Sequence, residues 1–255
     1  MNMSLIGLGI ALLTIVLLLV FGYRGRKGRW IKLRPIRAYD NFDTMVAQAV
    51  ESGGRVHISL GNNTLYQDDT AATLASLSIM DDVVETAAIS DRAPIITTAQ
   101  ATTQPLASDV MRRAYNRRDR SEQFERERAA VRLAALDDGV ALAGAVSSTI
   151  HDDNVQANIL MGSFGPEVAL MAETGHRHGI PQAIGSDQLE GQVIAYAMAD
   201  HSLVGEELLV APGYLTPDNA SAQSAIAVQD ILRWVVIGAI ILGALLRTFD
   251  LPLPF

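Results

Sequence analysis

The 255-residue chain has no cysteine, and only 5% of its residues are aromatic. The absence of cysteine excludes disulfides, a thiolate nucleophile, and zinc–thiolate or iron–sulfur sites. A chain of this length buries a sizeable core without such cross-links. The sequence also lacks Gly-x-Gly-x-x-Gly, Gly-x-x-x-x-Gly-Lys-Ser/Thr and Gly-x-Ser-x-Gly. A dinucleotide site of the usual kind, a P-loop nucleotidase and a nucleophile elbow are therefore unsupported.

Charge is unevenly distributed along a chain whose net charge is −8. Residues 38–230 contain 27 acidic and 11 basic residues, a net charge of −16, whereas residues 24–37 contain seven basic residues and no acidic one. The acidic middle region argues against a nucleic-acid partner. The basic segment predicts contact with anionic lipid headgroups.

The first of two apolar runs predicts a membrane span. Met3–Tyr23 is an uncharged run of 21 residues, and a helix of that length spans roughly 30 Å, the thickness of a bilayer's hydrocarbon core. Positive charge follows this run instead of preceding it, which favours a retained span over a signal peptide. The membrane-anchoring residues predicted at its end are Arg24, Arg26, Lys27 and Arg29.

The second run, Ile231–Phe249, predicts a second span with Trp234 as its interfacial anchor. The alternative is a buried helix of a soluble domain. The positive-inside rule places the middle of the chain in the cytoplasm and both termini outside. We therefore predict a transmembrane helix (1–23), a basic juxtamembrane segment (24–37), a cytoplasmic domain (38–215), a helix continuing into the second span (216–249) and a short tail (250–255).

Strand and helix patterns alternate between the two runs. Short apolar segments bounded by turn residues predict six strands, at 55–60, 94–98, 131–136, 155–161, 182–184 and 201–205; an extension of the last strand through Val210 stays open. Amphipathic or small-residue segments between them predict helices. Parallel strands need such crossovers, so the pattern predicts an α/β fold with a Rossmann-like, doubly wound, mostly parallel sheet between two transmembrane helices. Strand order stays open.

Ligands of open α/β sheets bind beyond the carboxyl ends of the strands. Gly162–Gly165 precedes a predicted helix whose free N–H groups suit an anion, but the pattern favours a tight turn that merely needs glycine. Asp187 and Glu190 also have the spacing of a capping box. We predict no catalytic residue, no metal site and no cofactor. The candidate ligand-binding residues are Gly61, Asn62, Thr97, Gly162, Ser163, Gly165, Asp187 and Glu206.

Other polar groups favour structural roles. His57 falls on a buried strand, which predicts a hydrogen-bonded core residue. His176 and His178 fall near a helix end and favour solvated side chains over metal ligands. The arginines between Arg112 and Arg132 are interleaved with acidic residues, which predicts a solvated segment with ion pairs.

The chain carries, in this order, the segments Val56–Gly61, Pro94–Thr98, Ala157–Glu167, Gly205–Leu208 and Asp230–Trp234, and the most specific parts are Gly162–Glu167 and Gly205–Glu207. These segments resemble an uncharacterised family of bacterial two-span membrane proteins, a domain-of-unknown-function family common in green non-sulfur bacteria. The resemblance implies the bacterial cytoplasmic (inner) membrane, and supplies no activity.

The function predicted first is that of a membrane-anchored, non-enzymatic protein in a homo-oligomeric or multiprotein membrane assembly. The alternative is a domain that binds or senses a small molecule of nucleotide or phosphate type. An enzyme ranks third, because its candidate carboxylates have no partner at a recognisable spacing: Asp137, Asp187, Glu206 and Glu207.

Overall fold

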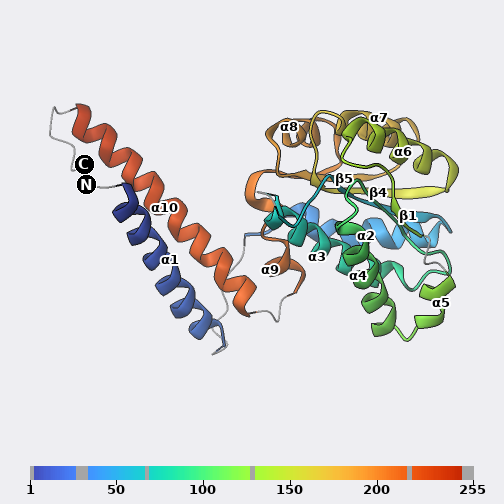
Figure 1. Ribbon diagram of the computed structural model, residues 1–255, viewed down its shortest axis with the longest axis horizontal. Coiled ribbons are helices and arrows are strands. Elements are labelled where there is room, and N and C mark those ends of the chain that lie inside the picture. The colour runs from blue at the N-terminus through green and yellow to red at the C-terminus, as the bar shows by residue number, and fades with distance from the viewer. Residues whose placement is uncertain (1–2, 27–33, 67–68, 127–129, 217–219, 249–255) are drawn as a thin grey trace. The chain divides into compact units, whose positions relative to one another are not determined.

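Figure 1 presents a computed structural model of the chain, which describes residues 3–26, 34–66, 69–126, 130–216 and 220–248. The chain forms two compact units. One is the continuous segment Pro35–Leu215, and the other combines the two terminal segments, Met1–Arg34 and Thr216–Phe255.

A six-stranded, all-parallel sheet forms the centre of the Pro35–Leu215 unit. The α/β fold with a parallel sheet is thus confirmed. The strand order is β3-β2-β1-β4-β5-β6, in which the direction of winding reverses between β1 and β4. This is the order of the doubly wound dinucleotide-binding folds. The strands are β1 (Arg55–Gly61), β2 (Ile95–Thr98), β3 (Val131–Leu133), β4 (Val155–Ser163), β5 (Gln182–Ser186) and β6 (His201–Leu203).

Helices cover both faces of the sheet (Figure 1). One face carries α2 (Arg37–Glu51), α3 (Thr70–Ala87) and α4 (Thr103–Arg117), and the other carries α6 (Gly139–Asp152), α7 (Val168–Arg177) and α8 (Leu189–Met198). The crossover from β3 to β4 through α6 takes the chain to the second face. Shorter elements are α5 (Ser121–Arg126), the 3-10 helix η2 (Gly205–Glu207) and α9 (Ala211–Leu215).

Helix α2 was not predicted from the sequence. Its position before the helix, Ile36, offers no side-chain cap, so a common start signal is missing. Its buried side chains nevertheless recur at helical spacing: Ala38, Tyr39, Phe42, Met45, Val46 and Ala49. This stripe packs against the sheet and stabilises α2 through tertiary contacts.

Two local predictions are wrong. The last strand ends at Leu203 and does not reach Val210, because Gly205 turns the chain at φ +65° into η2. The Glu207 carboxylate then accepts a hydrogen bond from the Val204 N–H at 3.1 Å. The capping box at the start of α8 is also absent, since Gln188 precedes the helix and makes no side-chain cap hydrogen bond.

A chain of buried hydrogen bonds crosses the four central strands. The tautomer that satisfies every partner places the proton of His57 on Nδ1, which donates to Asn158 Oδ1 at 2.7 Å, while Nε2 accepts from Thr97 Oγ1 at 3.0 Å. Asn158 Nδ2 donates to Gln182 Oε1 at 3.0 Å, and Gln182 Nε2 donates to the Ala172 carbonyl in α7 at 2.8 Å. The prediction that His57 is a hydrogen-bonded core residue is confirmed.

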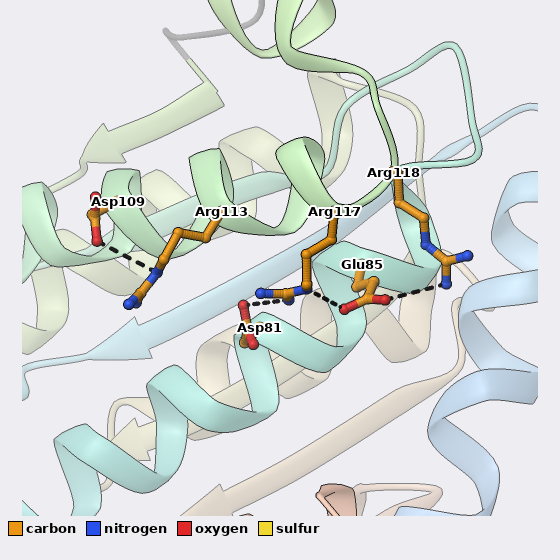
Figure 2. Close-up of polar contacts among 6 residues, drawn as sticks. All are labelled: Asp81, Glu85, Asp109, Arg113, Arg117 and Arg118. Atoms are coloured by element: carbon orange, nitrogen blue, oxygen red, sulfur yellow. Dashed lines mark hydrogen bonds and ion pairs between the residues drawn. The ribbon is translucent and has the colours of Figure 1, made fainter.

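The predicted ion pairs of the arginine segment are present on the outer surface of α3 and α4 (Figure 2). Arg117 contacts Asp81 at 2.8 Å and Glu85 at 2.6 Å, and Arg118 contacts Glu85 at 3.5 Å. These side chains are 33–42% exposed, so each pair contributes at most about 1 kcal/mol to stability. Beside them, burial and the neighbouring carboxylates, Asp43 foremost, raise the pKa of Asp82 to about 6.

The terminal unit contains two helices, α1 (Met3–Arg26) and α10 (Ala220–Thr248). Among the described residues, one helix is long and apolar enough to cross a membrane, Ala222–Leu245, with a mean hydropathy of 2.0. A shorter apolar stretch, Ala11–Tyr23, lies in α1. The predicted anchor Trp234 is 71% exposed on α10.

The predicted basic anchors fall at the end of α1. Arg24 and Arg26 belong to the last turn of this helix. Lys27 and Arg29 lie outside the described residues, as does the tail 250–255.

Stability should depend on the protonation of His57. Burial lowers the pKa of His57 to about 4, against 6.5 for an exposed imidazole. Between these values the unfolded chain binds more protons than the folded one, so stability falls as the pH drops from 6.5 to 4, by about 3 kcal/mol for this group. We expect His57→Gln to be less stable at pH 7 but to lack this acid-dependent loss, as measured by unfolding of the detergent-extracted chain.

The raised pKa of Asp82 has the opposite effect over pH 4–6, so the difference between the wild type and His57→Gln isolates the histidine. An identical pH slope in the two proteins would contradict the assignment.

Candidate functional site

A crevice of about 530 Å³ opens at the carboxyl ends of the central strands. It lies where the winding reverses between β1 and β4, the position at which open α/β sheets bind ligands. Three of the residues expected from the sequence line it: Asn62 after β1, Ser163 at the end of β4, and Asp187 after β5. The other lining residues are Thr64, Asp69, Asp137 and Gln188.

A hydrogen-bonded group joins three strand ends along one side of the crevice. Asp137 Oδ1 accepts hydrogen bonds from Asn62 Nδ2 and Gln100 Nε2, both at 2.9 Å. Gln100 Nε2 also donates to Asn62 Oδ1 at 2.8 Å. Asp137 adopts φ +53°, a left-handed conformation that aspartate tolerates better than most residues. The next residue, Asp138, caps α6 through the Ala141 N–H at 3.0 Å.

The turn after β4 satisfies its own backbone donors. The N–H groups of Ser163, Phe164 and Gly165 donate to Asn63 Oδ1 at 2.5 Å, Ser186 Oγ at 3.1 Å and Glu167 Oε1 at 2.8 Å, respectively. These N–H groups belong to the segment Gly162–Gly165, which was considered from the sequence as a site for an anion. Because side chains of the protein already occupy them, the turn lacks the free donors that a phosphate site requires.

Two of the carboxylates that line the crevice, Asp69 and Asp187, come from different loops. Both oxygens of Asp69 are bound to Thr64, at 2.8 Å from its N–H and 2.7 Å from its hydroxyl. Asp187 Oδ1 is shielded from solvent and has no hydrogen-bond partner in the described part of the chain. Burial raises the pKa of the Asp187 carboxyl, and a hydrogen bond with Ser163 partly opposes this.

The remaining expected residues shape the crevice or lie outside it. A Cβ on Gly162 would approach the Leu60 carbonyl at 2.2 Å, and one on Gly61 would approach the Ser163 carbonyl at 2.5 Å, so these glycines allow β1 and β4 to approach closely. A Cβ on Gly165 would meet the Glu167 carboxylate at 2.7 Å. Thr97 is buried in the sheet beside His57, and Glu206 is exposed in η2.

Sequence reasoning missed Thr64, Asp69 and Gln188. Asp69 does precede α3, but its side chain makes no cap hydrogen bond and turns to Thr64. Gln188 Nε2 donates to Ser163 Oγ at 2.7 Å, and this hydrogen bond links the residue before α8 to the end of β4. The only sequence signal for these residues was their position just past a predicted strand.

The crevice is acidic. Its lining includes three carboxylates, and none of the residues described around it is a lysine or an arginine. Within the described ranges, no three histidine, aspartate or glutamate side chains come together as a metal site. His151 and His178 do approach one another, with Nδ1 and Nε2 3.4 Å apart on the exposed ends of α6 and α7.

The fold and the crevice define a doubly wound α/β domain with a polar cleft at its switch point, in a chain that also carries an apolar helix of membrane-spanning length. The chain belongs to the family described as "Domain of unknown function (DUF6754)", which it matches over residues 2–253. The resemblance to an uncharacterised family is therefore confirmed. No curated protein and no solved structure matches the chain.

Proposed function

We propose that this protein is a membrane-anchored domain that binds a small molecule in the crevice between β1, β4 and β5. The observation that carries the proposal is the convergence of polar side chains from separate strand ends, Asn62, Ser163 and Asp187, on one cleft of about 530 Å³. A cleft of that volume is typical of small-molecule sites, and its position at the switch point is where this architecture places ligands.

The proposed binding is tested by thermal unfolding of the detergent-extracted full chain with ATP, inorganic phosphate, glucose, sorbitol, putrescine and spermidine. A ligand that binds the folded state alone stabilises it by about 2.7 kcal/mol at a hundred times its Kd. We expect at least one compound to raise the unfolding temperature saturably. Gln188→Ala should weaken the affinity for that compound about tenfold, because the substitution removes a side chain that lines the crevice and its hydrogen bond to Ser163.

Gln156→Ala is the matched control, since Gln156 is an exposed glutamine near the opposite end of β4. It should behave as the wild type. Stabilisation by none of the compounds, or equal loss in the two variants, would overturn the binding proposal.

We further propose that α1 and α10 both span the bacterial inner membrane, which leaves the α/β domain in the cytoplasm and both termini outside. The apolar side chains of α10 support this, because most of them are exposed within the described chain, as lipid-facing residues are: Val235, Val236, Ile240, Ile241 and Leu245. The basic residues that follow the first apolar run support the orientation.

A reporter fused to the carboxyl terminus should lie outside the cytoplasm. A matched fusion that ends at Leu215 lacks α10 and should place the same reporter inside, since only the first span then precedes it. Protease protection of the reporter in spheroplasts distinguishes the two positions. The same location for both fusions would refute the two-span arrangement.

A second candidate function, self-assembly in the membrane, is favoured by the outer side of α8. Leu189, Val193 and Tyr196 are 71%, 61% and 78% exposed and recur at helical spacing along one stripe. Surface helices usually present polar residues outward, so an uncharged apolar stripe is typical of a protein interface. We propose that two copies of the chain pair through this stripe.

Val193→Glu should convert the assembled chain to monomer, because pairing would bury a carboxylate from each copy. Ile89→Glu is the control, since Ile89 follows α3 on the other side of the sheet and is 59% exposed. The mass of the chain in mild detergent distinguishes the assembled form from the monomer. A monomeric wild type, or an unchanged mass for Val193→Glu, argues against this assembly.

A further inference from the structure

The crevice has more hydrogen-bond acceptors to offer than donors. Asn62 Nδ2 donates to Asp137, Gln188 Nε2 donates to Ser163, and the Thr64 hydroxyl donates to Asp69, so each of the two amide groups has one N–H beyond these bonds and the hydroxyl has none. A carboxylate has about four lone-pair sites, so Asp69 and Asp137 retain acceptor capacity after these bonds. Asp187 also lines the cleft; because its Oδ1 is shielded from solvent, the acceptor that it offers to a ligand is its other carboxylate oxygen.

Backbone donors do not restore the balance. Three successive N–H groups after β4 are bound to Asn63, Ser186 and Glu167. Beyond β5, the Asp187 N–H donates to the Gly162 carbonyl at 3.3 Å and the Gln188 N–H donates to Ser186 Oγ at 3.1 Å. A phosphate would therefore meet three carboxylates and would find these five N–H groups already bound, which is an unfavourable environment for an anion.

The three carboxylates also do not converge on one point. Asp69, Asp137 and Asp187 stand on three different loops around the cleft, and no triad of described side chains is close enough to hold a single metal ion. Separated acceptors around a cleft of about 530 Å³ match an extended ligand with donors at more than one position.

From this juxtaposition we infer that the ligand is a small aliphatic amine with more than one ammonium or hydroxyl donor. Its ammonium group binds Asp187, and its other donors reach Asp69 and Asp137. The inference rests on the proposed binding function and names the class of ligand. It also accounts for a switch-point cleft that carries no glycine-rich phosphate loop.

Asp187→Asn is the decisive variant, because it removes the charge and keeps the shape of the side chain. Binding of putrescine and spermidine to the full chain in neutral detergent and 150 mM salt is measured by calorimetry, beside sorbitol, ATP and inorganic phosphate. We expect saturable binding of an amine by the wild type and at least about tenfold weaker binding by Asp187→Asn.

Asp91→Asn controls for general attraction of polycations to an acidic domain. Asp91 has a fully exposed side chain, and its only described ion pair is a 3.8 Å contact with Arg120. This variant therefore loses the same charge away from the cleft and should change the Kd for the amine less than twofold.

Equal weakening of amine binding by the two variants, or no binding of either amine, overturns the amine assignment. Crevice-dependent binding of sorbitol, ATP or phosphate in place of the amines overturns it too, but leaves the binding function intact. If none of the compounds binds, both proposals fail.

Discussion

The buried hydrogen bonds that run from Thr97 through His57 and Asn158 to Gln182 align the four central strands. Each member would leave an unsatisfied polar group in the core if its strand slipped by one residue, at about 1–3 kcal/mol per group. The register therefore has few alternatives. Beyond this chain β4 and β5 keep their register up to Gly162 and Ser186, whereas β1 and β4 shift by one residue between Ser59 and Gly61, so that Ser163 pairs with Gly61. The interaction that aligns the strands thus also brings Asn62, Ser163 and Asp187 to the same edge of the sheet.

Close approach of β1 and β4 is the second condition for the crevice. Gly61 and Gly162 provide it, because the space for a Cβ at either position is already filled by a carbonyl of the other strand. The turn that follows β4 then closes on itself through Asn63, Ser186 and Glu167. A cleft in the position of a nucleotide site results, with the N–H groups of that turn already bound and three carboxylates in its lining. The chemistry of the site differs from that of the architecture's best-known members for this reason.

Much of the fold was predictable because local patterns and tertiary structure agree there. The six strands and the helices between them have apolar spacing that a single sequence displays. Helix α2 was missed because Ile36 cannot cap it and packing on the sheet stabilises it. Asp187 and Glu190 had the spacing of a capping box, yet Asp187 turns toward the cleft, where the end of β4 lies beside it. In both cases contacts distant in sequence outweighed the local signal.

The sequence alone determined the alternation of strands and helices, the apolar terminal segments and the acidity of the middle region, since all three depend on residue type and spacing. It also indicated the edge of the sheet at which a site would lie. Only the tertiary structure determined three further features: the strand order, the hydrogen bonds of Asn62 with Gln100 and Asp137, and the hydrogen bonds that occupy the N–H groups of the turn after β4. These features join residues far apart along the chain, and the choice among partners depends on which strands become neighbours, a property that no local pattern encodes.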